Sequence, residues 1–245
     1  MYDEIIQASK SVEVIKRQGS PIIVIQSDPK DEDKILDKTQ VDYYEMLPDL
    51  AGSKAQYIKE RANVSEESST TPVRAVTRNL STAFTIAKGF DVDWWVSILG
   101  DVTISNLVGI NNIIHKMIKS GKHIGITRPV GQVFLDNHNK PTRIQRNDTT
   151  DFMSQFFIVK SDLVKNGLFN NIKITNPYTG EQCVGDEVNR YCDEKGIKFS
   201  DLCYFISDYA YPKFIDGVQY NPDRTKLPRY IDGIVNALRK FRHRI

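Results

Sequence analysis

The feature that most constrains the fold is the alternation of short apolar runs with segments whose apolar residues follow helical spacing. The runs PIIVIQSD (21–28) and DWWVSIL (93–99), and the apolar centre of MSQFFIVKSDLV (153–164), have the length and composition of buried strands. Strands separated by helical segments are typical of an α/β fold, with a mixed, mostly parallel central sheet and helices on both faces. The segments predicted as helices are 73–90, 102–122 and 185–196. A strand with its following loop is predicted at 123–134, a strand or loop at 41–47, and a low-complexity linker or flexible loop at 65–72.

Length and charge limit the function classes that fit this chain. With 245 residues and a net charge of +2, it is long enough for one large domain and carries no global basic field for nucleic acid. Its three cysteines form no CxxC pair, which argues against a disulfide framework and for a reducing, cytoplasmic environment. The N-terminus lacks a signal-peptide apolar core, and no apolar run reaches the roughly 20 residues of a membrane span. We therefore expect a single domain over 1–245.

Two carboxylates follow predicted strands at the point where each strand ends. Asp28 closes the first apolar run, and Asp101 comes after Gly100 at the end of the second. In open α/β sheets, ligands bind beyond the carboxyl ends of the strands, and glycine lets the backbone approach a ligand closely. Asp101 is equally suited to an ordinary turn or helix N-cap, a role that Thr103 and Ser105 also support.

Residues 74–102, RAVTRNLSTAFTIAKGFDVDWWVSILGDV, resemble the helix, strand and acidic motif of glycosyltransferases of the GT-A fold. The resemblance extends over about residues 20 to 200 and rests on the order and spacing of loose motifs. It implies a GT-A-like domain whose nucleotide-sugar-binding half spans about 20–130. The acceptor-binding half would span about 131–225. The residues it implies for donor binding are Ser27, Asp28, Arg74, Arg78, Asn79, Gly100 and Asp101.

The same resemblance implies a divalent metal, Mn²⁺ or Mg²⁺, held near the donor diphosphate. GT-A enzymes usually carry Asp-x-Asp here, whereas this chain has Leu99-Gly100-Asp101. Only the last acid is retained, so either a metal depends on Asp101 together with a ligand from elsewhere in the chain, or the enzyme works without a tightly held metal.

The acidic pair Asp186-Glu187 resembles the carboxylates that open a helix near the acceptor in GT-A enzymes. In an inverting enzyme, one such carboxylate removes the proton from the acceptor hydroxyl, and we favour Asp186 over Glu187 for this role. Alternatively, both acids merely complement the dipole at the start of a helix. Gln155, before the FFIV run, and Arg128, after a predicted strand end, are further candidates for acceptor or phosphate contacts. Each is equally well explained as an ordinary polar residue.

The basic C-terminal segment 226–245 has the pattern of an amphipathic helix. Its apolar residues fit one helical face with arginines nearby, which suits peripheral contact with an anionic membrane. Packing of a last helix on the core explains the pattern at least as well.

These features favour a glycosyltransferase that moves a sugar from a nucleotide-diphosphate sugar to a hydroxyl acceptor, such as a growing glycan. The main alternative is a sugar nucleotidyltransferase, although SDPKDEDK (27–34) lacks the glycine that such enzymes usually carry after the first strand. A third possibility is a GT-A-like binding module without activity, for which Leu99 in place of an acid is the motive.

Overall fold

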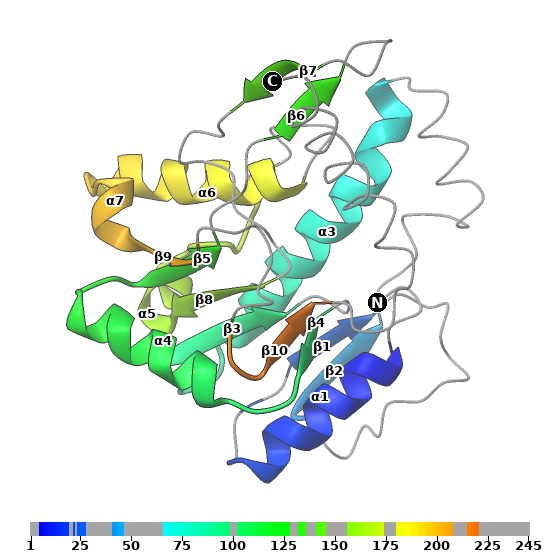
Figure 1. Cartoon of the computed structure of the whole chain (residues 1–245), viewed down its shortest axis with the longest axis vertical. Coiled ribbons are helices and arrows are strands. Elements are labelled where there is room, and N and C mark those ends of the chain that lie inside the picture. Colours follow the sequence, from blue (N-terminus) through cyan, green and yellow to red (C-terminus); the bar gives the residue numbers. More distant parts are fainter. Residues whose placement is uncertain are drawn as a thin grey trace, which may run out of the picture.

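A computed structural model describes residues 5–19, 22, 24–27, 41–46, 66–98, 102–127, 132–135, 141–145, 156–173, 180–207 and 215–220. The described elements form a mixed α/β structure, as the sequence predicted (Figure 1). The helices are α1 (Ile5–Arg17), α3 (Glu66–Ala87), α4 (Val108–Lys119), α5 (Ser161–Lys165), α6 (Gly180–Lys195) and α7 (Phe199–Leu202). The strands are β1 (Val24–Ser27), β2 (Tyr43–Met46), β3 (Trp94–Ile98), β4 (Val102–Ile104), β5 (Ile124–Thr127), β6 (Gln132–Leu135), β7 (Pro141–Gln145), β8 (Phe156–Lys160), β9 (Cys203–Ser207) and β10 (Val218–Tyr220).

A four-stranded sheet in the order β3-β8-β5-β9 forms the centre of the described structure. β8 runs antiparallel to both of its neighbours, and β5 runs parallel to β9. Further pairs are β1 with β2, which is parallel, and β4 with β10 and β6 with β7, which are antiparallel. The mixed sheet is thus confirmed, although parallel pairing takes a smaller share of the described ladders than the sequence predicted.

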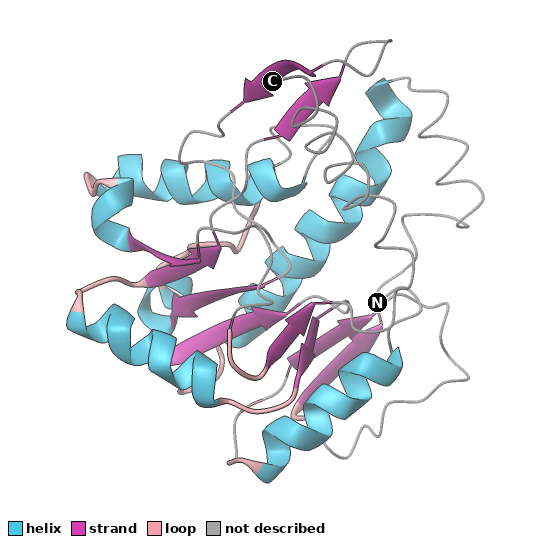
Figure 2. Ribbon diagram, in the orientation of Figure 1, coloured by secondary structure: helices cyan, strands magenta, loops and turns pink. Residues whose placement is uncertain are grey.

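Helices cover both faces of this sheet (Figure 2). On one face, β8 presents Phe157 and Val159 to a core that includes α3, α5 and α6. On the other, it presents Phe156 and Ile158 to a core that includes α4, β4 and β10. Burial on both faces explains why β8 reads as a continuous apolar run although its neighbours are antiparallel.

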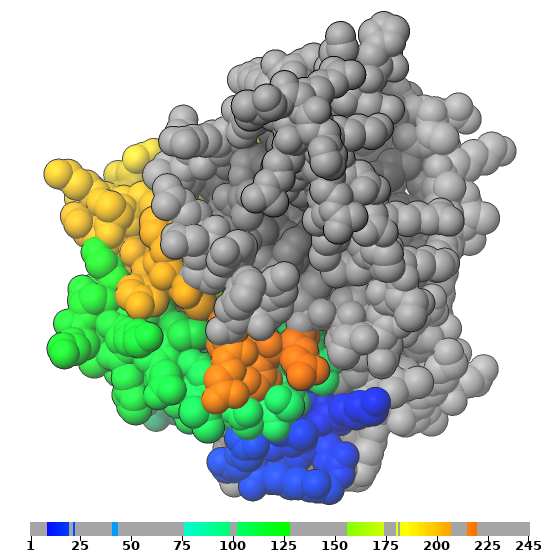
Figure 3. Space-filling model, in the orientation of Figure 1, coloured from blue at the N-terminus to red at the C-terminus, as the bar shows by residue number. Residues whose placement is uncertain are grey.

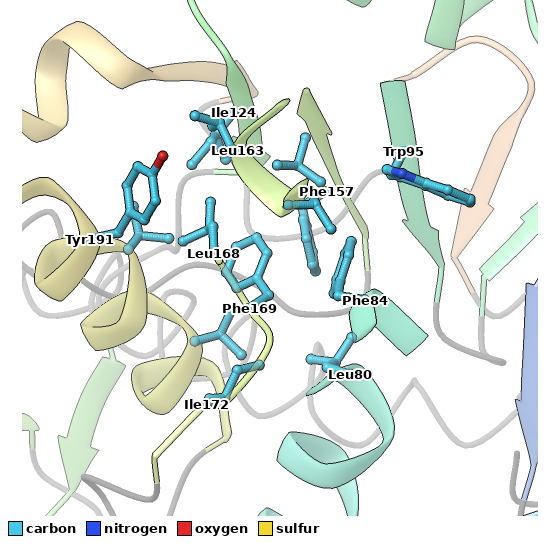
Figure 4. Close-up of a cluster of buried hydrophobic side chains, with 14 of the residues drawn as sticks. Leu80, Phe84, Trp95, Ile124, Phe157, Leu163, Leu168, Phe169, Ile172 and Tyr191 are labelled. Atoms are coloured by element: carbon cyan, nitrogen blue, oxygen red, sulfur yellow. The ribbon is translucent and has the colours of Figure 1, made fainter. Parts of the chain in front are cut away.

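Aromatic rings hold the first core together. Phe84 of α3 lies 5.8 Å from Phe157 and 5.1 Å from Phe169 between ring centroids, and Phe157 lies 5.3 Å from Phe169 (Figure 4). Tilted ring pairs at such distances add about 0.5–1.5 kcal/mol each beyond the burial of their area. Trp95 packs in this core, whereas Trp94 packs against the other, as expected for adjacent residues of a strand.

The second core joins segments that are distant in the sequence. Ser11 of α1 accepts a hydrogen bond of 2.9 Å from the backbone N–H of Ile104, and α1 packs against β4. Residues 215–220 pack beside α4, as the orange and green surfaces in Figure 3 show. Here the Gly109 N–H donates to the Asp216 carbonyl, 3.2 Å away. A Cβ atom on Gly109 would lie 2.2 Å from that carbonyl oxygen, so this contact requires glycine.

Three element boundaries differ from the sequence predictions. Residues 66–72, predicted as part of a linker or flexible loop, form the first turns of α3. Residues 102–104, predicted as helix, form β4 because they pair with β10, more than 100 positions later in the chain. α6 begins at Gly180, which is buried against Val76, rather than at residue 185.

The segment 123–134, predicted as one strand and its following loop, forms β5 and then most of a second strand, β6, because residues 132–135 pair with β7. Other element predictions agree with the structure or lie beyond its described part. Residues 43–46 form a strand, one of the two options for 41–47, and β8 leads directly into α5. All three cysteines are described, all are buried, and none forms a disulfide. None of the described helices combines the length and apolar composition needed to cross a bilayer. The C-terminal segment 226–245 lies outside the described residues.

Candidate functional site

The ends of four strands lie along one edge of the central sheet, here called the carboxyl edge. β3 ends at Ile98, which pairs with Phe156, the first residue of the antiparallel β8. β5 ends at Thr127, which pairs with Ser207, the last residue of β9. Phe157 pairs with Ile126, which brings the two halves of the edge into register.

Four predicted site residues are joined in sequence to these strand ends. Gly100 and Asp101 follow β3, Arg128 follows β5, and Gln155 precedes β8; all four lie outside the described residues. Separate sequence motifs predicted these residues to bind the donor, the acceptor and the metal. The strands that adjoin them in the sequence end at one edge of the sheet, where α/β sheets bind ligands.

Arg78 and Asn79 belong to the part of α3 that lies beyond the carboxyl edge. The C-terminus of α3 leads into the start of β3, which lies opposite the carboxyl edge. The helix therefore approaches the carboxyl edge toward its N-terminus. Phe84 of α3 contacts Phe157, which is one residue from the edge, so this turn of the helix lies close to the edge. Arg78 and Asn79 lie five to six residues further toward the N-terminus, about 8 Å along the helix axis.

These two side chains are partly buried and contact each other. The Arg78 Nε and Nη2 atoms lie 3.4 and 3.3 Å from Asn79 Oδ1. Both are long hydrogen bonds. For Arg74 and Ser27 the structure describes the backbone of α3 and β1, which pack together, whereas Asp28 lies outside the described residues.

Asp186 and Glu187 lie in the second turn of α6, not at its start, because the helix begins at Gly180. This weakens the alternative in which they complement the helix dipole, since that effect falls off within the first turn. Gly180 contacts Val76 of α3, so the first turns of α6 lie next to the part of α3 that is close to Arg78.

The two acids have different surroundings. Glu187 is 3% exposed and receives hydrogen bonds of 2.9 and 2.6 Å from Arg190 Nε and Nη2. These hydrogen bonds, with a further one to Glu194, raise the pKa of the Arg190 guanidinium above its usual range. Glu187 is thereby occupied in a bidentate ion pair, whereas Asp186 is only partly buried. Neither surrounding tests the predicted proton transfer, which stays a prediction.

The described residues do not assemble the predicted metal site. Within the described ranges, no group of three or more His, Cys, Asp or Glu side chains is placed to hold a metal ion. Asp101, the predicted ligand, lies outside those ranges. The proposals below therefore route no step through a metal.

Sequence reasoning missed a polar group at the carboxyl edge. Thr127 is fully buried, and its Oγ1 atom has no hydrogen-bond partner. The residue was recognised as a strand end, but nothing in TRPV (127–130) distinguishes a buried hydroxyl from an exposed one.

Comparisons with known proteins give only distant likenesses. No protein-family model matches the chain, and no curated protein matches it significantly. One similar structure is a protein described as a glucose-1-phosphate thymidylyltransferase from Bacillus anthracis, in complex with sucrose. It has 14% identity and a TM-score of 0.43, over 96% of this chain and 82% of that one. Another is HddC from Yersinia pseudotuberculosis, with 9% identity and a TM-score of 0.34, over 77% and 84%. With both TM-scores under 0.5, neither likeness argues for an activity.

Proposed function

We propose that this chain is a transferase that binds a nucleotide-diphosphate sugar at the carboxyl edge. The observation that supports the proposal is the alignment of the ends of β3, β5, β8 and β9, to which predicted donor and acceptor residues are joined. α3 adds Arg78 and Asn79 near the same edge, so cationic and amide donors lie near the place where a diphosphate would bind.

The reaction that the sequence favours is glycosyl transfer to a hydroxyl acceptor. The Arg78 guanidinium would hold diphosphate oxygens and stabilise the charge that grows on the diphosphate as the sugar leaves. Asp186 would accept the proton of the acceptor hydroxyl, which then forms the new bond to the sugar carbon. This assignment predicts inversion at the anomeric carbon.

Sugar nucleotidyl transfer is the second candidate, since its product is the same kind of ligand. In that reaction a sugar 1-phosphate attacks the α-phosphate of a nucleoside triphosphate, and pyrophosphate leaves. It is the activity named for the Bacillus anthracis protein, which aligns with 96% of this chain. We therefore include an assay for sugar nucleotidyl transfer below. The absence of glycine from SDPKDEDK argues against this activity.

Calorimetry with UDP-, GDP- and dTDP-sugars, with and without Mn²⁺, tests the binding that both reactions share. Pyrophosphate release from nucleoside triphosphates with sugar 1-phosphates then separates nucleotidyl from glycosyl transfer. We expect Arg78→Ala to weaken binding, and Lys88→Ala, which removes an exposed positive charge just beyond α3, to leave it unchanged. Absence of binding to every nucleotide sugar, together with absence of pyrophosphate release, would refute the proposal. Binding without turnover would instead support the inactive module.

A further inference from the structure

The hydroxyl group of Thr127 is buried at the carboxyl edge without a partner. The described residues contain five buried side-chain atoms that lack a hydrogen bond, namely Trp95 Nε1, Thr103 Oγ1, Thr127 Oγ1, Ser161 Oγ and Asn170 Oδ1. Thr127 is the one among them that ends a strand of the central sheet at the carboxyl edge. A buried hydroxyl without a partner is unfavourable, and such groups call for an explanation.

The backbone at this position is irregular as well. The register between β5 and β9 shifts between Ile126 and Thr127, so that Thr127 pairs with Ser207 while Ile126 pairs with Phe205. Irregularities of this kind are frequent in the outer strands of sheets, where β9 lies, and beside active sites, where they redirect side chains or end a ladder. The extra residue is Ile206 of β9, so the irregularity lies in the strand beside Thr127, at the same end of the ladder as the unpartnered hydroxyl.

Thr127 belongs to the face of the sheet that α4 covers. Side chains alternate along β5, so Thr127 shares the face of Gly125, where a Cβ atom would lie 2.8 Å from Met117 of α4. β4, the strand that follows Asp101 in the chain, packs in the core on this same face. Arg78 and Asn79 belong to α3, which packs on the opposite face.

We propose that the Thr127 hydroxyl hydrogen-bonds a hydroxyl group on the sugar of the bound nucleotide-diphosphate sugar. A threonine hydroxyl both donates and accepts, as a sugar hydroxyl does, whereas a phosphate only accepts and is better matched by a guanidinium. The two faces of the edge then divide the ligand, with the sugar beside Thr127 and the phosphates toward Arg78. This assignment rests on the proposed function and adds which residue selects the sugar.

Thr127→Val tests the proposal because it removes the hydroxyl and keeps the shape of the side chain. Without ligand, the variant should be more stable than the wild type, with a melting temperature about 2–4 °C higher, since an unpartnered hydroxyl is lost. It should bind nucleotide-diphosphate sugars about three- to tenfold more weakly while binding the nucleoside diphosphate alone as the wild type does. Thr127→Ser should keep the affinity for the nucleotide sugar.

Ser161→Ala is the matched control, since it removes the same kind of unpartnered hydroxyl at the other end of β8. It should alter the affinity for neither ligand. Equal weakening of nucleoside diphosphate and nucleotide sugar by Thr127→Val would overturn the sugar assignment, as would unchanged affinity for both. Lower stability of the ligand-free variant would mean that the hydroxyl has a partner within the protein, which also overturns it. A wild type that binds no nucleotide sugar removes both this inference and the proposed function.

Discussion

The two edges of the central sheet are built differently. At the edge opposite the carboxyl edge, backbone hydrogen bonds tie neighbouring segments together. Ser161 N–H donates to the Asp93 carbonyl at 2.9 Å, Lys160 N–H to the His123 carbonyl at 2.9 Å, and His123 N–H to the Leu202 carbonyl at 2.8 Å. These bonds connect the segments at the ends of β3, β5, β8 and β9, so backbone hydrogen bonds within the protein stabilise this edge.

At the carboxyl edge the structure describes the ends of the strands themselves. Its strands end at Ile98, Thr127 and Ser207, beside a bulge and an unpartnered hydroxyl. A rigid scaffold on one side and polar groups at the strand ends on the other is the arrangement by which α/β proteins position binding residues. If the carboxyl edge binds the ligand as proposed, substitutions there should change ligand binding, and substitutions at the opposite edge should change stability.

The largest effect is expected for Asp101→Asn, which removes a carboxylate three residues after β3. If Asp101 serves the diphosphate, turnover should fall about 100-fold or more, in the range typical for removing one group that stabilises a transition state. Asp162→Asn is the control, because it also neutralises one aspartate but belongs to the opposite edge, in a 3.1 Å ion pair with Lys160. Asp162 is 64% exposed, so its loss should change stability by no more than about 1 kcal/mol and leave turnover intact.

Steady-state kinetics and thermal unfolding of both variants check this prediction. Equal turnover in Asp101→Asn and the wild type would remove the functional distinction between the edges and favour the turn or N-cap role for Asp101.

A smaller effect is expected in α6, which connects the two edges. Glu187→Gln keeps the shape of the side chain but breaks the ion pair with Arg190. Because the Arg190 side chain is 36% exposed, we expect a loss of about 1–2 kcal/mol in the free energy of unfolding, below that of a fully buried pair. Urea unfolding measures this loss, and the variant should retain its turnover per folded molecule.

Asp186→Asn is the matched variant one residue earlier, and it should lower turnover more than stability. Adding Arg190→Met to Glu187→Gln should recover part of the lost stability, since the partly buried guanidinium is removed and Glu194, which loses its ion pair, is 56% exposed. A stable but inactive Glu187→Gln would transfer the catalytic assignment from Asp186 to Glu187.

The sequence predicted the elements whose signals are local. The apolar runs that became β3 and β8 and the helical spacing that became α4 are each legible within about a dozen residues. β4 was missed because its three residues become a strand only through pairing with β10, and the start of α6 was missed because it depends on packing against Val76. Non-local pairing and packing override local propensity in both places.

The candidate site was predictable in part for the same reason. Strand-end positions are local, so Asp101 and Arg128 were named from sequence, and the fold connects the strands that precede them to one edge. That Glu187 is buried in an ion pair follows from its i, i+3 spacing to Arg190 together with packing of α6 on α3, and only the spacing is visible in sequence. The lack of a partner for Thr127 depends on every neighbour in space, so no local pattern reveals it.

The smallest expected effect concerns His123, at the opposite edge. Burial, followed by the charge of Lys160, lowers the pKa of its imidazole, and the charge of Asp162 partly opposes this. The unfolded state therefore binds the proton more readily, so the stability of the folded state decreases as the pH falls below the ordinary histidine pKa of about 6.5. In His123→Gln this contribution is absent, and the decrease in melting temperature between pH 7.5 and 5.5 should be shallower than in the wild type. Affinity for a nucleotide sugar at pH 7.5 should be unchanged, because the residue belongs to the edge that the chain itself holds together. Weakened binding in His123→Gln would show that the opposite edge also contributes to the ligand site, and the division between the two edges would then fail.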